Sequence, residues 1–245
     1  MSESEYSIII PCHNEQDTIR GTVTDLIEAV SSIPNINFVL VDNLSSDATW
    51  ERLQALELEF KNVSIHRSEP RAGFGVAIRS GVVSSTGTHI VFVMADGSEH
   101  PNDVAKFIAT SMKSPESCVF GDRFASPGLI SGYPPFKRFL NRLVNWLLGL
   151  AFRTNSPDLT NGFKLYPRDV IERINPKSDD FSITLELSLG AICAGVRVIT
   201  IPTFWRGREA GKSSFNLIAM SLPYLSVIAK YLRNRSRGLD KSNLV

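Results

Sequence analysis

Polar side chains that could bind a ligand follow several short apolar runs of this sequence, at the point where each run ends. They are Asn14 and Glu15 after the first run, Asp42 after the second, Asp96 after a later one, and Asp122 with Arg123 after the last. A carboxylate accepts hydrogen bonds and binds hard cations, and an arginine fork suits phosphate oxygens. The alternative is that Asp and Asn form turns and helix caps here. Because the pattern recurs, we favour one shared site.

The apolar runs themselves are predicted strands, at Tyr6–Ile10, Phe38–Val41, Val63–His66, His89–Met94 and Cys118–Gly121. Apolar residues at helical spacing predict helices between them: one capped by Asp17 or Thr18, one after Ser45–Asp47, one over Ala77–Val83 and one that begins at Pro101. This alternation indicates an α/β fold with a mostly parallel sheet flanked by helices. Ligands of such sheets bind beyond the carboxyl ends of the strands, which is where the polar side chains fall.

The second half of the chain carries amphipathic segments. Phe124–Pro135 is rich in Gly, Pro and Ser and is a predicted surface loop. The helix predicted over Phe136–Phe152 combines Trp and Leu with Lys137, Arg138 and Arg142 in its first turns. This mixture is typical of a helix in a membrane interface, although a core helix with a solvated basic end gives the same pattern.

A helix is predicted over Ile183–Ala194 and a strand over Val196–Ile201. The apolar segment Leu217–Leu232 is interrupted by Pro223 and is followed by a basic tail. It is too short and broken for a membrane span, so we expect an amphipathic helix that lies on a membrane or pairs with the earlier helix.

Composition excludes several classes of protein. The 245 residues include 26 Lys and Arg against 25 Asp and Glu, so a net charge of +1 gives no general attraction to nucleic acid. Three cysteines, far apart, form neither a zinc pattern nor a disulfide framework, which favours a reducing, cytoplasmic setting. The first residues do not have the pattern of a signal peptide. No Gly-x-Gly-x-x-Gly follows the first predicted strand, which disfavours a dinucleotide-dependent oxidoreductase.

Several strings of residues, taken in order, resemble a known enzyme family. The first are Ile9–Glu15 (IIPCHNE), Val41–Asp47 (VDNLSSD) and Ala95–Gly97 (ADG), which resemble the inverting nucleotide-sugar glycosyltransferases with the GT-A fold. The later strings are Gly121–Arg123 (GDR), Asp158–Phe163 (DLTNGF) and Arg208–Ser213 (REAGKS). They narrow the resemblance to the dolichol-phosphate mannose synthases and their bacterial polyprenyl-phosphate relatives.

The resemblance implies a GT-A-type, Rossmann-like sheet with a nucleotide pocket. The residues that it places in this pocket are Pro11, His13, Asn14, Glu15, Asp42, Gly75 and Ala95. Asp42 contacts the nucleoside in this interpretation, and His13 stands where the family usually has Tyr. Gly75 lies in a loop where small residues let the backbone approach a ligand.

Asp96 is the main catalytic candidate that the resemblance implies. The family presents Asp-x-Asp here to hold Mg²⁺ or Mn²⁺ on the donor diphosphate, whose negative charge grows as the glycosidic bond breaks. In this chain Met94 replaces the first Asp, and a thioether is a poor ligand for these cations. Ser98 takes the position of a further ligand, and Glu99 is near enough in sequence to substitute. Three outcomes follow: weaker metal binding, binding through Asp96 with phosphate and water, or loss of the metal.

An acceptor phosphate is already anionic at neutral pH, so it needs cations that hold it rather than a general base. The residues that the resemblance places at the phosphates are Arg123 and Arg138 on the acceptor side, and Arg208, Lys212 and Ser213 on the donor side. The family has a Ser shortly after the second Arg, where this chain offers Asn141 or Arg142. The alternative for Arg138 is a solvated helix face.

These expectations define one hypothesis and two alternatives. We expect a GT-A catalytic domain over 1–212, including the helix 136–152, and an amphipathic helix with a basic tail over 213–245. The expected reaction moves a sugar from GDP-mannose or a UDP-sugar to a polyprenyl or dolichyl phosphate, with inversion, on the inner, cytoplasmic face of a membrane. A homo-oligomer or a membrane subunit stays open. The alternatives are the same fold with a soluble or polysaccharide acceptor, which as an alcohol needs a base, and a nucleotide-binding homologue that has lost catalysis.

Overall fold

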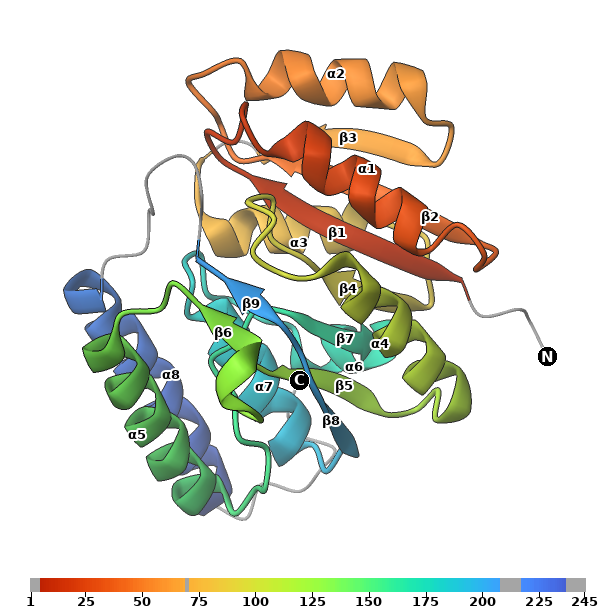
Figure 1. Cartoon of the computed structure of the whole chain (residues 1–245). Coiled ribbons are helices and arrows are strands. Elements are labelled where there is room, and N and C mark those ends of the chain that lie inside the picture. The colour runs from red at the N-terminus through yellow and green to blue at the C-terminus, as the bar shows by residue number, and fades with distance from the viewer. Residues whose placement is uncertain (1–4, 69–70, 208–216, 237–245) are drawn as a thin grey trace.

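The computed structural model describes residues 5–68, 71–207 and 217–236, in which strands and helices alternate from β1 to β5 (Figure 1). The first half contains β1 (Tyr6–Cys12), α1 (Ile19–Ala29), β2 (Ile36–Asp42), α2 (Thr49–Glu59), β3 (Val63–Arg67), α3 (Phe74–Ser84), β4 (His89–Phe92), α4 (Pro101–Lys113) and β5 (Cys118–Asp122). The second half contains a 3₁₀ turn (Pro127–Leu129), β6 (Ile130–Ser131), α5 (Pro135–Phe152), β7 (Lys164–Pro167), α6 (Arg168–Ile174), α7 (Ile183–Cys193), β8 (Val198–Pro202), β9 (Trp205–Arg206) and α8 (Leu217–Ser236).

One sheet of seven strands has the order β3-β2-β1-β4-β7-β5-β8. β1 runs parallel to β2 and β4, and β5 runs parallel to β8, whereas β7 lies antiparallel between β4 and β5. The prediction of a mostly parallel sheet flanked by helices is confirmed. Because β7 points the other way, its first residue, Lys164, pairs with Phe92 and Phe120 near the carboxyl ends of β4 and β5.

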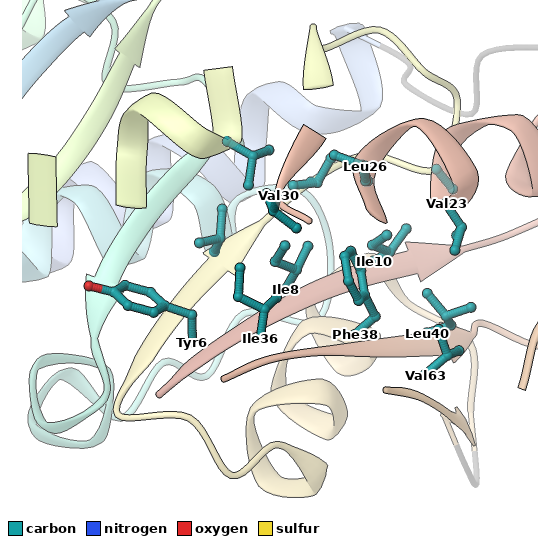
Figure 2. Packing of buried hydrophobic residues seen from close by; sticks show 14 of the residues in the cluster. Tyr6, Ile8, Ile10, Val23, Leu26, Val30, Ile36, Phe38, Leu40 and Val63 are labelled. Carbon is teal, nitrogen blue, oxygen red and sulfur yellow. The ribbon is translucent and has the colours of Figure 1, made fainter. Parts of the chain in front are cut away.

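Side chains that alternate along β1 divide between two layers of helices. Ile8 and Ile10 belong to one cluster with Val23 and Leu26 of α1 (Figure 2). Residues of α2 and α4 complete this cluster. Ile9 belongs to the opposite cluster, to which α3, α5, α6, α7 and α8 contribute. Both faces of the sheet are therefore covered, which explains why the strands appear in the sequence as continuous apolar runs.

α7 is a core helix, in which every residue from Ile183 to Ala191 is buried. A helix that is buried on every side needs neighbours all round, and α7 contacts α3, α5, α6 and α8. Gly190 permits this packing, since a Cβ at that position would lie 2.7 Å from Cγ2 of Ile174 and 2.9 Å from the hydroxyl of Tyr231.

α8 continues through Pro223, so the interruption predicted at this proline is absent from the helix. Its buried side chains Val227 and Tyr231 pack in the same cluster as α7. Nζ of Lys230 donates a hydrogen bond of 2.8 Å to Oε1 of Glu186 on α7. The helix is thus an integral part of the layer that covers the sheet.

α5 lies in this layer as well, with Leu148 and Phe152 buried. Nη1 of Arg235 in α8 donates to the carbonyl oxygen of Ala151 in α5 at 2.9 Å, which joins the ends of the two helices (Figure 1). None of the helices in the described part of the chain is long and apolar enough to cross a membrane.

The predicted surface loop Phe124–Pro135 contains β6, which pairs in parallel with β9. The rings of Tyr133 and Trp205 meet edge to face with centroids 5.0 Å apart. The backbone N–H of Gly207 donates to Ser131 O at 2.8 Å. The segment that leads into α5 is therefore fixed to the segment that approaches Arg208.

Candidate active site

A small pocket lies at the rim of the sheet, which is the edge where the parallel strands end, and the space of about 320 Å³ around it includes open solvent. Pro11 from the end of β1 and Met94 from the end of β4 line it, together with the polar residues Asn161, Lys164 and Thr184. Two strings that carry the family resemblance, those around Pro11 and Met94, therefore face one cavity. This is the location that a parallel sheet provides for a ligand.

Asp42, the predicted nucleoside contact, is fully buried at the end of β2. Its Oδ2 accepts a hydrogen bond of 3.1 Å from Nε of Arg67, and its Oδ1 accepts one of 3.2 Å from the N–H of Ser45. The Arg67 guanidinium in turn lies 4.3 Å from the ring centroid of Trp50. The Asp42 carboxylate therefore fixes the positions of Ser45 and Arg67 beside the end of β2. Its contact with a nucleoside stays a prediction.

The loop between β1 and α1 is fastened to the start of α2. Asn14, with a left-handed φ of 56°, accepts a hydrogen bond of 2.8 Å from the N–H of Ser46. The backbone N–H of Glu15 donates to Oγ1 of Thr49 at 2.8 Å. His13 is exposed, and its Nδ1 lies 2.8 Å from the carbonyl oxygen of Asn43. These contacts give Asn14 and Glu15 the local structural role weighed above, and their contact with nucleotide stays a prediction.

Gly73 and Gly75 pack against the backbone of another segment. A Cβ on Gly75 would overlap the carbonyl oxygen of Ser178, and the Gly75 N–H donates to Asp179 O at 2.8 Å. The N–H of Gly73 donates to Oδ1 of Asn43 at 2.7 Å. The small residues here thus admit the chain's own backbone, and the contact of Gly75 with a ligand stays a prediction.

Asp96 follows β4 in a tight turn and is partly exposed. Its Oδ1 accepts a hydrogen bond of 3.1 Å from the N–H of Ser98, and Gly97 adopts the left-handed φ of 66° that the turn requires. The carbonyl oxygen of Ala95 accepts a hydrogen bond of 3.1 Å from Oγ1 of Thr22 on α1. The turn therefore holds the Asp96 carboxylate at the rim, two residues from Met94 in the pocket wall.

Glu99 is a second carboxyl group beside Asp96, but it is buried. Its Oε2 accepts a hydrogen bond of 3.2 Å from the N–H of Met94. Burial and the nearby charge of Asp96 raise the pKa of Glu99 to about 8. At neutral pH Glu99 is thus mostly a neutral acid.

The divalent cation that the resemblance implies must be tested against these side chains. Within the described residues, no three His, Cys, Asp or Glu side chains are grouped as metal ligands. Ser98, the other predicted ligand, is only 3% exposed. Mg²⁺ is commonly held by one or two carboxylates, with water and substrate phosphates completing its shell. Asp96 fits that arrangement, so a cation here depends on the phosphates of a bound nucleotide.

Arg123, predicted to hold a phosphate, forms a two-pronged ion pair with Asp158. Nε lies 2.8 Å from Oδ2 and Nη2 lies 2.9 Å from Oδ1, and both side chains are buried. Although burial lowers it, the pKa of Arg123 rises above its ordinary value because Asp158 stabilises the charge. The pair fixes the guanidinium at the end of β5, and Nη1 takes no part in it. Asp158 is thus the buried partner of an arginine.

Asn145, which is not among the predicted site residues, joins α5 to the loop that carries Asp158. Its side chain is buried, its Oδ1 accepts a hydrogen bond of 2.7 Å from the N–H of Leu159, and its Nδ2 donates to Oγ1 of Thr160 at 3.1 Å. Nδ2 also donates to Oδ1 of Asn141 at 2.7 Å. A polar residue on the buried face of an apolar helix was the available signal.

The other residues that were predicted to hold phosphate are more exposed than Arg123 or lie outside the described residues. Arg138 is partly exposed in the first turns of α5. Arg142 is exposed. Burial raises the pKa of Asp122, and the positive charge of Arg142 offsets a small part of that rise. Arg208, Lys212 and Ser213 lie outside the described residues, so the roles given to them stay predictions.

Lys164 is a pocket residue that sequence reasoning missed. It directly follows the string Asp158–Phe163, is 1% exposed and lines the pocket. Burial lowers the pKa of this lysine to about 7.

Comparison with known proteins identifies the family to which this chain is similar. Residues 7–174 match glycosyl transferase family 2. A dolichol-phosphate mannosyltransferase of Pyrococcus furiosus is 24% identical over 210 residues, which are 84% of this chain and 58% of that protein. A polyprenol monophosphomannose synthase of Mycolicibacterium smegmatis is 25% identical over 220 residues, which are 85% of this chain and 80% of that protein. The chain thus spans less than two thirds of the first relative.

Solved structures agree on the fold. Glucosyl-3-phosphoglycerate synthase from Mycobacterium tuberculosis, in complex with Mn²⁺, uridine diphosphate and glucosyl-3-phosphoglycerate, aligns with a TM-score of 0.71 at 16% identity, covering 95% of this chain and 81% of that one. A mycobacterial protein aligns with a TM-score of 0.73 at 18% identity, covering 95% of this chain and 76% of that one. At these identities the likeness concerns the GT-A-like fold.

Proposed function

The chain belongs to glycosyl transferase family 2, and from this premise we propose that it transfers a sugar from a nucleoside diphosphate to a polyprenyl phosphate, with inversion at the anomeric carbon. The observation that carries the lipid acceptor is an exposed apolar face on α5, the helix that Asn145 fastens to the Asp158 loop at the rim. The names of two curated relatives, which act with dolichol or polyprenol, support the same acceptor.

On the donor side, Asp96 is the residue that would hold a divalent cation against the diphosphate. Such a cation, when bound, supplies positive charge to the leaving group. The turn around Gly97 keeps the carboxylate at the rim before any ligand arrives, which limits the reorganisation needed on binding. Pro11 and Met94 form the apolar wall beside it.

On the acceptor side, Arg123 is held by Asp158 and presents Nη1 to a phosphate. A phosphate monoester carries more than one negative charge at pH 7, so its oxygen attacks the anomeric carbon without losing a proton to a base. A single attack opposite the leaving diphosphate inverts the configuration. Arg138 and Arg142 add positive charge at the start of α5, where the acceptor headgroup enters.

We place the protein on the cytoplasmic surface of a membrane through the α5–α8 face. This face consists of the exposed residues Phe136, Phe139, Leu143, Trp146, Leu147 and Leu150 of α5 and Leu222, Leu225 and Leu232 of α8. Phe139 is 65% exposed, Trp146 60% and Leu222 76%. Large exposed apolar patches mark interaction sites, and basic residues beside them favour anionic lipid.

The reaction is tested by incubating the purified chain with UDP-glucose, GDP-mannose and related donors, with Mn²⁺ or Mg²⁺, and with either a polyprenyl phosphate or 3-phosphoglycerate. We expect a lipid-linked sugar from one donor. A product with 3-phosphoglycerate alone would favour the soluble-acceptor alternative. Nucleotide binding without turnover for any pair would favour the alternative that catalysis has been lost.

The membrane face is tested by flotation with vesicles of phosphatidylglycerol and phosphatidylcholine. Trp146→Glu is expected to weaken binding by at least about tenfold, because burying a bulky apolar side chain is worth on the order of 1.5–3 kcal/mol. Leu58→Glu is the matched control, since Leu58 is 90% exposed on α2, outside this face. Equal binding by both variants would contradict the assignment.

A further inference from the structure

Lys164 is a buried lysine in the wall of the pocket. Its side chain enters from the first position of β7 and is 1% exposed. Nζ donates hydrogen bonds of 2.7 Å to Leu159 O and 2.6 Å to Oγ of Ser188, and it lies 4.6 Å from the centroid of the Phe120 ring. The ammonium thus holds the loop residue that directly follows Asp158.

The charges around Lys164 leave it without a dedicated anion among the described residues. Asp158 raises its pKa and Arg123 lowers it, but these two groups already form an ion pair with each other. Cys118 on β5 is a thiol, which is neutral at pH 7 because burial raises its pKa. On α7, the carboxylate Glu186 is bonded to the N–H groups of residues 177 and 178 and to Lys230.

A protonated Lys164 is therefore an excess buried positive charge beside a pocket. Burial without a counter-ion disfavours the charged form, which explains why the pKa of Lys164 falls to about 7. An anion that binds at the mouth of the pocket supplies the missing charge and favours protonation. The same protonation strengthens the hydrogen bond to Leu159 O, next to the Asp158–Arg123 pair.

We propose that Lys164 is a positioning residue that takes up a proton when a nucleoside diphosphate binds, and that its charge then holds the 158–161 loop in place. The inference rests on the proposed function, since it takes an anionic donor to bind beside this pocket. No bond is made or broken in this step: one proton passes from solvent to Nζ.

The test is isothermal titration of the full chain with uridine or guanosine diphosphate and Mn²⁺, in two buffers of different ionisation enthalpy. At pH 8 a lysine with a pKa of about 7 is mostly neutral, so binding should take up as much as about 0.9 proton per site. The phosphates contribute little there, because their second pKa is near 6. No proton uptake by the wild type would overturn the proposal.

Substitutions of Lys164 distinguish the effect of its positive charge from the uptake of a proton. Lys164→Arg keeps the charge at all pH values and is expected to bind without uptake of this proton. Lys164→Met is expected to bind at least about tenfold more weakly, because charge-assisted hydrogen bonds and the ammonium are lost. Lys106→Met is the control, since that ammonium is exposed on α4 and pairs with Asp103. Uptake that persists in Lys164→Met would overturn the proposal.

A measurement without nucleotide distinguishes this proposal from the proposed function. The pKa of Lys164 is lower in the folded than in the unfolded chain, so the unfolded chain binds more protons between pH 7 and about pH 10. The stability of the wild type should therefore rise with pH in this window relative to Lys164→Met, in urea unfolding. If this rise occurs but no diphosphate binds, the proposed function fails. If it is absent, the assignment of Lys164 fails.

Discussion

Replacing Asp96 with asparagine is expected to lower the rate of sugar transfer by about a thousandfold, with little effect on stability. The variant removes the negative charge that the turn presents at the rim, and the loss of one electrostatic contact of this kind costs on the order of a hundredfold to a thousandfold in kcat. The hydrogen bond from Ser98 is kept, because an amide oxygen accepts it as a carboxylate does. Transfer rates under single-turnover conditions and thermal unfolding measure the two effects.

Asp25→Asn is the matched control, since Asp25 is exposed on α1 and lies outside the predicted site. Its rate should equal that of the wild type. Retention of more than about a tenth of the rate by Asp96→Asn would mean that this carboxylate does not carry the catalytic charge, because the expected loss is at least a hundredfold. Restored activity at high Mn²⁺ would instead indicate that asparagine still binds the cation weakly.

Replacing Asp158 with alanine is expected to destabilise the fold by about 3–5 kcal/mol, because the change leaves the buried guanidinium of Arg123 without its counter-ion. Arg123 and Asp158 are 11% and 0% exposed in their side chains, so solvent cannot replace the lost pair. The free energy of unfolding from urea titration measures the loss.

Asp169→Ala provides the comparison for that experiment. Asp169 pairs with Arg173 on the surface of α6, with side chains 69% and 55% exposed, and such exposed pairs contribute at most about 1 kcal/mol. Equal effects of the two substitutions would show that Arg123 is not buried with its charge. The double variant Arg123→Met with Asp158→Leu is expected to recover much of the stability, because neither charge then remains unpaired.

The parallel part of the sheet was predictable from sequence for a physical reason. β1, β2 and β4 are covered on both faces, so each appears as an unbroken apolar run, and the predicted runs agree with the strands to within a few residues. β7 was missed because it begins with a buried lysine and ends in Pro167, and its place depends on hydrogen bonds to β4 and β5. β6 and β9 were missed because each has two residues and depends on the other.

The site was predictable in its positions more than in its partners. Met94 and Pro11 do face one pocket, and Asp96 does lie at the rim. Arg123 and Asp158 belong to separate motifs of the sequence. Their ion pair joins residues 35 positions apart, so only the fold reveals it. Lys164 was overlooked because nothing local distinguishes a buried lysine from an exposed one.

The contact between Lys230 and Glu186 bears on how this protein can be shortened. The Lys230 ammonium pairs with Glu186, a carboxylate 2% exposed in the first turn of α7, and that carboxylate also anchors the segment that packs on Gly75. Truncation before α8 would remove its exposed leucines, which is often done to improve expression. It would also leave the charge of Glu186 without Lys230 and would expose α7 to solvent. Solubilising substitutions on the outer surface of α8 are therefore the better route than deletion.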